Sequence, residues 1–217
     1  MLDAAQELWM ILGGVSNTLA ISLFSLLIGL AIGLPLAFVR IYEKDIGYLV
    51  EIFEKIFRGI PELVLMLLFF FGVGYYFPFP FKNPFFTAIF VLGLRSAANQ
   101  SQIFRCAIHG VGEEQMIAAR SIGLSRLKSI RHVMVPQVFV YSTPGLGSEY
   151  ALLVKDSSYV FVLGVLDILF QANAVKAISY DIVTPYVIAG ILYILLTFPI
   201  ATYLDMWGSK RKKKLGL

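Results

Sequence analysis

Long stretches of the sequence contain no charged side chain, and this pattern constrains the fold more than any other feature. They include those between Glu7 and Arg40, Glu62 and Lys82, Lys82 and Arg95, and Asp181 and Asp205. A helix needs roughly 20 mostly apolar residues to cross about 30 Å of hydrocarbon. The whole chain is 58% hydrophobic and only 15% charged, whereas soluble domains are typically about 25% charged. We therefore expect a protein that crosses a lipid bilayer several times.

The pattern predicts an all-α membrane protein with five transmembrane helices in one domain of residues 1–217. The predicted spans are 8–39, 61–77, 85–104, 137–170 and 182–205. The first is longer than a bilayer requires, so we expect it to tilt or to begin as a segment at the interface. Prolines at 78 and 80 predict a turn after the second span.

Basic residues indicate the orientation of these helices. Fourteen of the 18 lysines and arginines fall in the loops 40–58 and 105–131 or in the tail 207–217. Such residues are enriched in cytoplasmic loops, so we expect these segments and the C-terminus in the cytoplasm and the N-terminus outside. The acidic N-terminus argues against a signal peptide. The basic run 210–214 is expected beside anionic head groups, with no role in binding nucleic acid.

The segment 112–136, between the third and fourth predicted spans, is too polar to cross a membrane. Apolar residues at helical spacing on both sides of Gly123 predict a helix, a glycine turn and a second short helix. Ser125 is a suitable N-cap for the second helix. Ala118 and Ala119 leave a face without bulk that another protein could approach closely. A solvated amphipathic loop without a partner explains the same pattern.

The order Ile117-Ala118-Ala119, three residues, Gly123, nine residues and Val133-Met134-Val135-Pro136 resembles the cytoplasmic EAA loop of ABC importer permeases. That loop reads E-A-A, three residues, G, nine residues, I-x-L-P, so Ile117 replaces its glutamate. Other stretches resemble the polar amino acid branch of the family and extend the resemblance over about residues 14–206. They are Asn17-Thr18-Leu19 with Gly29, Gly33 and Arg40; Arg58-Gly59-Ile60-Pro61; Gln102-Ile103-Phe104-Arg105; and Leu146-Gly147-Ser148-Glu149-Tyr150 with Lys155-Asp156-Ser157-Ser158.

The resemblance implies a multi-pass permease subunit of an ATP-driven importer for polar or charged amino acids, in a prokaryotic inner membrane. It implies three partners: a cytoplasmic ATPase, an identical or related second permease chain, and an extracytoplasmic solute-binding protein. The sequence has no G-x-x-x-x-G-K-[ST] phosphate loop, so we expect no enzyme activity and ATP-Mg bound by the ATPase partner. The residues expected to dock that ATPase are Glu114, Ile117, Ala118, Ala119, Arg120, Gly123 and Arg126.

Ionisable residues inside a span are costly and usually face a cavity or a partner. Glu149 and Asp156 are two helical turns apart, so both carboxylates are expected near one face. We hypothesise that they receive an α-ammonium or a cationic side chain on the substrate path. The predicted path residues are Asn99, Glu149, Asp156 and Ser157. The structural alternative is that Arg95 or Lys155 pairs with a carboxylate to close the bundle. Proline and glycine at 144–147 predict a break in this helix.

An ion-coupled secondary transporter of amino acids is the alternative function, because such carriers also use intramembrane carboxylates. It needs no docking loop, and five spans are few for a carrier built from inverted repeats. His109 and His132 have no ligand at metal-binding spacing, and the single cysteine, Cys106, excludes an internal disulfide. We therefore expect neither a metal nor a catalytic site. Gly29 and Gly33 form a small-xxx-small pair, which favours close helix packing.

Overall fold

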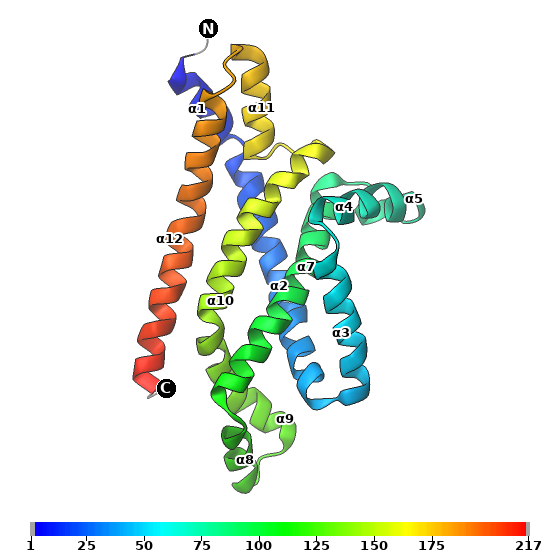
Figure 1. The fold of residues 1–217 in the computed structure, drawn as a ribbon, viewed down its shortest axis with the longest axis vertical. Helices are drawn as coiled ribbons and strands as arrows, with labels where there is room; N and C mark the ends of the chain where they lie inside the picture. Colours follow the sequence, from blue (N-terminus) through cyan, green and yellow to red (C-terminus); the bar gives the residue numbers. More distant parts are fainter. Residues whose placement is uncertain (1–2, 216–217) are drawn as a thin grey trace.

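The computed structural model describes residues 3–215, and every regular element in that part of the chain is helical (Figure 1). The elements are α1 (Ala4–Leu12), α2 (Val15–Tyr42), α3 (Lys44–Gly59), α4 (Glu62–Leu67), the π-helical η1 (Leu68–Val73), α5 (Gly74–Tyr76), α6 (Pro78–Phe81), α7 (Pro84–Val111), α8 (Glu113–Ser121), α9 (Arg126–Ser129), the π-helical η2 (Ile130–Met134), α10 (Val135–Asp156), the 3-10 helix η3 (Ser157–Leu163), α11 (Ile168–Ser179) and α12 (Thr184–Leu215).

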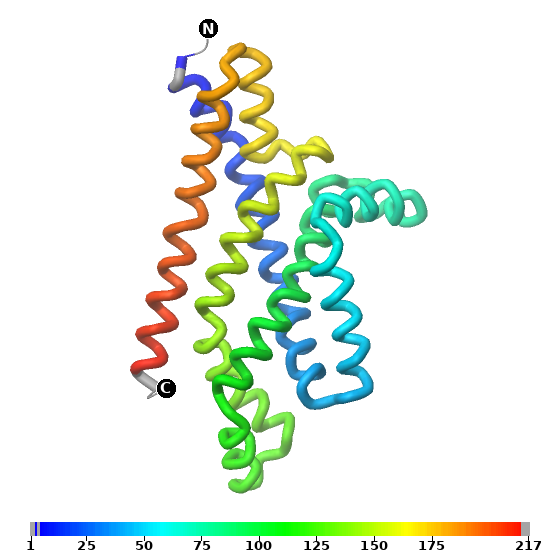
Figure 2. Tube along the Cα trace, viewed as in Figure 1, coloured from blue at the N-terminus to red at the C-terminus, as the bar shows by residue number. Residues whose placement is uncertain are grey.

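Long helices form the body of the molecule. α2, α7, α10 and α12 run along its long axis, α7 packs on both α2 and α10, and α10 packs on α12 (Figure 1). α3 turns back from the lower end of α2 and packs on α2 and α7, while α4 and α5 project sideways from its upper end. The chain starts at the upper end and finishes at the lower end (Figure 2). α8 and α9 also lie at the lower end, beyond the bundle.

The predicted seam of small residues joins α2 to α7. A Cβ atom on Gly29 would overlap the side chains of Gln100 and Ser96. One on Gly33 would lie 2.8 Å from the carbonyl oxygen of Ala97. Only a hydrogen at these two positions lets the helix axes approach this closely, so the close packing predicted from the glycine pair is confirmed.

The prediction of a loop at 40–58 is wrong, because residues 44–59 form α3. The charged side chains of this segment lie on a helix and form ion pairs with charged side chains nearby. Glu51, Glu54 and Lys55 recur at helical spacing, and the first two form ion pairs with Arg40 of α2. The chain then bends by 102° between α3 and α4. Pro61 lies at this bend, where its ring disfavours helix in the residue before it.

The predicted break at 144–147 is also wrong, since α10 continues through it. Pro144 cannot donate to the carbonyl of Val140, four residues earlier. The hydroxyl of Thr143 donates to that carbonyl instead, at 2.9 Å. The glycines serve close packing: a Cβ on Gly145 would lie 2.6 Å from Ile103 of α7. The real bend, of 52°, comes later, between η3 and α11.

Two helical stretches among residues 3–215 are long and apolar enough to cross a membrane, Ala5–Tyr42 and Thr184–Lys213. Each bent pair, α3 with α4–α5 and α9–η3 with α11, could supply one more span. Five spans and their orientation stay predictions. The first predicted span is interrupted between α1 and α2, at Gly13 and Gly14. The α2–α3 turn, the α8–α9 loop and the C-terminal end do lie at one end of the molecule, as the charge distribution predicted (Figure 1).

Candidate functional site

A cavity lies between the lower half of α7 and the middle of α10, with the end of α3 on its rim, and has a volume of about 550 Å³. Small-molecule sites typically have roughly 300–1,000 Å³. Most of its wall is apolar or uncharged. The lining residues are Arg58, Asn99, Gln102, Ile103, Cys106, Ala107, Tyr141, Ser142, Gly145, Ser148, Glu149 and Leu152.

Two of the predicted path residues meet at this cavity. The side-chain amide of Asn99 donates to Glu149 Oε2 at 3.1 Å, and its oxygen accepts from Arg58 Nε at 3.0 Å. Glu149 is only 2% exposed, and its other oxygen, Oε1, has no hydrogen-bond partner among the described residues. Arg58 is exposed. The arrangement is therefore a guanidinium, an amide and a carboxylate in a row from α3 through α7 to α10.

The other two path residues lie apart from the cavity lining. Asp156 accepts from Arg95 at 2.6 Å, and Arg95 also contacts Glu62 of α4 at 2.6 Å. Arg95 thus ties α7 to α10 and α4, as the structural alternative expected of this arginine. The hydroxyl of Ser157, the first residue of η3, is buried and donates to the carbonyl of Val154 in α10. The four residues therefore form two clusters along α7 and α10.

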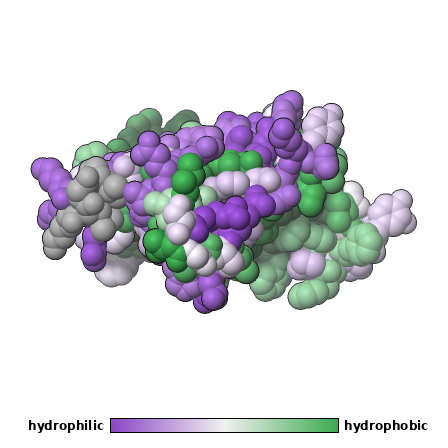
Figure 3. Space-filling model, turned by 90° about the horizontal axis from the view of Figure 1, so that it is seen from below, coloured by the Kyte–Doolittle hydropathy of each residue, from purple (hydrophilic) through white to green (hydrophobic). Residues whose placement is uncertain are grey.

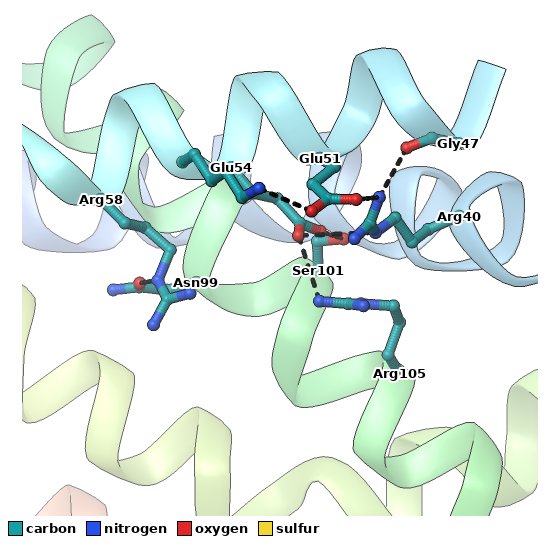
Figure 4. Close-up of polar contacts among 9 residues, drawn as sticks. Arg40, Gly47, Glu51, Glu54, Arg58, Asn99, Ser101 and Arg105 are labelled. Carbon is teal, nitrogen blue, oxygen red and sulfur yellow. Dashed lines mark hydrogen bonds and ion pairs between the residues drawn. The ribbon is translucent and has the colours of Figure 1, made fainter. Parts of the chain in front are cut away.

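A second polar cluster joins α2, α3 and α7 (Figure 4). Its centre is Glu54, which is 2% exposed. This carboxylate accepts from the hydroxyl of Ser101 at 2.7 Å and from Arg105 at 3.1 Å. Arg40 lies 3.8 Å from it and pairs with Glu51 at 2.7 Å. Buried charges that are paired in this way hold three helices in one relative position.

The loop between α7 and α10 has the predicted form of a helix, a glycine turn and a helix. Gly123 has φ +88°, a conformation that residues with a Cβ rarely adopt. Ser125 is the N-cap residue of α9, although its side chain makes no capping hydrogen bond. Met116 and Ala119 are buried and attach α8 to the bundle. Ala119 therefore faces the chain itself, whereas Ala118 is exposed.

The tip of this loop presents large apolar side chains to solvent. The side chains of Ile117, Ile122 and Leu127 are 63%, 79% and 74% exposed. Glu114 and Arg120 are also exposed and lie on the same helix as Ile117. From below, hydrophobic patches stand among the hydrophilic side chains that cover this end of the molecule (Figure 3). An apolar tip with charged surroundings is typical of a surface that another protein covers.

Arg126, one of the predicted docking residues, is occupied within the chain. Its guanidinium pairs with Glu43 at 3.0 Å, donates to the carbonyl of Tyr42 at 3.1 Å and lies over the Tyr42 ring at 4.9 Å from the ring centre. These contacts fasten α9 to the turn between α2 and α3. Within residues 3–215, no group of three or more His, Cys, Asp or Glu residues is arranged to hold a metal ion.

The sequence pattern does not indicate Arg58, Glu62 and Glu54 as members of these sites. Arg58 and Glu54 lie in the segment 40–58, which the pattern predicts as a loop. Their spacing with Glu51 places them at i, i+3 and i+7, along one side of a helix, and this was the available signal. Glu62 comes directly after Pro61, and nothing in its spacing indicates that it would meet Arg95.

Solved structures identify the class of fold. The chain superposes with a TM-score of 0.82 and 26% identity on the crystal structure of an amino acid ABC transporter with histidines, covering 97% of this chain and 99% of that one. A chain of the MetNI methionine ABC transporter, in an inward-facing conformation, has the same fold, with a TM-score of 0.77 at 19% identity. The fold is that of an ABC transporter permease.

The family follows from the sequence comparisons. The chain belongs to the binding-protein-dependent transport system inner membrane components, whose family model matches residues 15–212. It is 30% identical to the arginine transport system permease protein ArtQ of Bacillus subtilis, over 86% of this chain and 85% of that protein. It is 31% identical to the arginine ABC transporter permease protein ArtQ of Haemophilus influenzae, over 83% of each, and 30% identical to the nopaline permease NocM of Agrobacterium fabrum, over 88% and 83%.

Proposed function

We propose that this chain is the permease subunit of an ABC importer for amino acids, located in the inner membrane. The family match over residues 15–212 carries this proposal. It is supported by relatives named as permeases for arginine, nopaline and glutamine, all of which are amino acids or their derivatives. We expect ATP-Mg to be bound and hydrolysed by a separate ATPase subunit, and solute to arrive on a binding protein outside the membrane.

The ATPase subunit is proposed to bind the α8–α9 loop. The apolar side chains exposed at the tip would become buried when the ATPase binds, and the charged side chains around them would orient the two proteins. The residues proposed for this contact are Glu114, Ile117, Ala118, Arg120 and Gly123, with Ile122 and Leu127 added. Ala119 and Arg126 are proposed to act indirectly, by holding α8 and α9 on the bundle.

A proline at Gly123 tests this docking. Proline fixes φ near −65°, whereas this turn has φ +88°, so Gly123→Pro must rearrange the loop tip. We expect the variant to lose co-purification of the ATPase and ATP-driven uptake together. Gly190→Ala is the matched control, because a Cβ there meets nothing within 4 Å. A stable complex with normal uptake in Gly123→Pro would contradict the docking proposal.

The substrate path is proposed to include Asn99 and Glu149 at the cavity, Asp156 at the end of α10 and Ser157 at the start of η3. Measured uptake and substrate-stimulated ATPase activity of Glu149→Gln and Asp156→Asn test this assignment. We expect a raised apparent KM in Glu149→Gln. If the apparent KM is unchanged in both variants, neither carboxylate contacts the solute, and Asp156 serves only to hold Arg95.

A second permease chain is proposed to complete the pathway, because the cavity wall comes from only three helices of this chain. The mass of the purified complex tests this proposal. We expect two permease chains and two ATPase subunits in it. A stable, transport-competent complex with a single permease chain would contradict it, as would uptake that runs without any ATPase.

A further inference from the structure

The lower end of α12 carries a run of basic side chains that the proposed transport function does not use. The run includes Lys210, Arg211, Lys212 and Lys213. Among the side chains that the structure describes, no carboxylate lies within 4.0 Å of these four groups. By contrast, Arg40, Arg95 and Arg105 in the bundle each contact a carboxylate. Neighbouring cations without a counter-charge in the chain favour an anionic partner outside it.

The depth of this run fits the surface of a bilayer. α12 lies along the outer edge of the bundle (Figure 1), and exposed apolar side chains on it, such as Ile194 and Phe198, suit contact with lipid tails. From Thr184 to Trp207 the helix rises about 35 Å at 1.5 Å per residue, close to the roughly 30 Å of a hydrocarbon core. Trp207 and the cations after it therefore lie where the head groups begin, a depth at which tryptophan is enriched.

Aromatic rings hold two of these cations in place. The Arg211 guanidinium lies over the Trp207 ring, 5.4 Å from the ring centre. Lys212 Nζ lies 4.5 Å from the centre of the Tyr141 ring, which belongs to α10. Such contacts are attractive because the face of an aromatic ring is electronegative. A cation over a ring still has donors that point away from it, so both groups can bind an anion.

Close packing fixes the position of the helix that carries them. A Cβ atom on Gly208 would overlap the side chain of Thr143, so α12 is in tight contact with α10 at this point. Lys212 follows Gly208 by about one turn and lies on the same side of α12, which brings it to Tyr141. Lys210 is two residues before Lys212, about 200° around the helix, and so lies on the opposite side. The pair Arg211 and Lys212 is therefore distinct from the rest of the run.

We infer that Arg211 and Lys212 bind the phosphate of an anionic phospholipid, in a discrete site between the lower ends of α12 and α10. The inference rests on the proposed location in the inner membrane and on no step of solute transport. A phosphodiester has a negative charge and several acceptor oxygens, which match two adjacent cationic donors. The acyl chains of the lipid continue along the exposed apolar side chains of α12, a contact that a soluble phosphate lacks. Phosphatidylcholine has the same phosphate, but its own ammonium offsets the charge.

Native mass spectrometry of the purified importer complex in detergent tests this site, because it resolves single bound lipids by their mass. The probe is phosphatidylglycerol, compared with phosphatidylcholine of the same acyl chains and with glycerol 3-phosphate. One cation near a membrane surface favours anionic lipid roughly five-fold, so two cations favour it about 25-fold. In the wild type we expect phosphatidylglycerol to reach half-occupancy at a concentration about 25-fold lower than phosphatidylcholine. Glycerol 3-phosphate at the same concentration should not displace it.

Substitutions within the basic run separate a discrete site from diffuse attraction. Arg211→Gln and Lys212→Gln should each raise the half-occupancy concentration of phosphatidylglycerol about five-fold, and the double variant about 25-fold. Lys210→Gln is the matched control, because it removes the same charge from the same run but from the opposite side, and should change it less than about two-fold. Tyr141→Leu should weaken binding, whereas Tyr141→Phe, which keeps the ring, should leave it unchanged.

Three results would overturn the inference. If Lys210→Gln weakens binding as much as Lys212→Gln, the attraction is diffuse and no discrete site exists. If phosphatidylcholine binds as tightly as phosphatidylglycerol, or glycerol 3-phosphate displaces it, the ligand is not an anionic lipid. If the double variant releases the ATPase or a permease chain from the complex, the two cations belong to a protein interface. Amino acid import is measured on the same preparations, so the lipid site can fail while the proposed function holds, and the reverse.

Discussion

Glu54 is the buried carboxylate on which α2, α3 and α7 converge, so its replacement by glutamine should loosen all three helices (Figure 4). Removing one partner of a buried ion pair costs about 3–5 kcal/mol, because the remaining charge stays uncompensated. Here Arg40 and Arg105 keep 18% and 24% of their side-chain surface exposed, and Arg40 retains Glu51. Solvent screening reduces the cost, so we expect Glu54→Gln to lower the free energy of unfolding by about 2–3 kcal/mol.

The measurement is a denaturant titration of the purified chain in detergent, followed by circular dichroism. Asp205→Asn, which removes an exposed carboxylate from α12, is the control and should cost less than about 0.5 kcal/mol. The double variant Glu54→Gln with Arg105→Gln should be less destabilised than the sum of the single variants, because it leaves fewer unpaired charges. A loss in Glu54→Gln no larger than in the control, or strict additivity in the double variant, would refute the reasoning.

Three further substitutions test the packing and the loop. Gly29→Val should destabilise the chain by about 1–3 kcal/mol or more in the same titration, because its side chain must displace residues of α7. Thr143→Val should cost about 1 kcal/mol, since it leaves the Val140 carbonyl without the hydroxyl that replaces the proline N–H; an unchanged free energy would mean that another group satisfies it. Arg126→Gln should speed amide hydrogen exchange in α9 while the rate in α12 stays constant, and equal rates in α9 would show that its contacts do not hold the loop.

The sequence predicted the polar positions well and their partners poorly. Asn99 and Glu149 are conspicuous because polar residues are rare in apolar helices, and they do meet at a cavity. The sequence leaves the partner of Asp156 open between Arg95 and its chain neighbour Lys155, and in the structure the partner is Arg95. Successive side chains on a helix point in different directions, so the neighbour in sequence was the poorer candidate. Only the packing of α7 against α10 decides which cation is within reach.

Two errors in the predicted fold have the same physical origin. Each prediction considers a residue by itself and takes no account of the groups that contact it in the folded chain. Charges in α3 suggested a loop, but a helix tolerates them where helices α2 and α7 supply opposite charges. Pro144 suggested a break, but the hydroxyl of Thr143 satisfies the freed carbonyl. In both cases a second side chain satisfies the charge or the carbonyl whose energetic cost was the basis of the prediction. The turn predicted at Gly123 is confirmed, because the constraint that glycine satisfies there is local to the backbone.

α3 is the element that contacts both proposed functional regions. Its N-cap residue, Glu43, pairs with Arg126 of the α8–α9 loop, and Arg58 near its other end lines the cavity. The helix is 16 residues long, or about 24 Å at 1.5 Å per residue. A displacement of the loop reaches the cavity through α3 only if the helix moves as a rigid unit, and Glu54 provides its anchorage on α7. Glu54→Gln should therefore reduce solute uptake per ATP hydrolysed even where the variant remains folded, and unchanged coupling in the folded variant would exclude α3 as the connecting element.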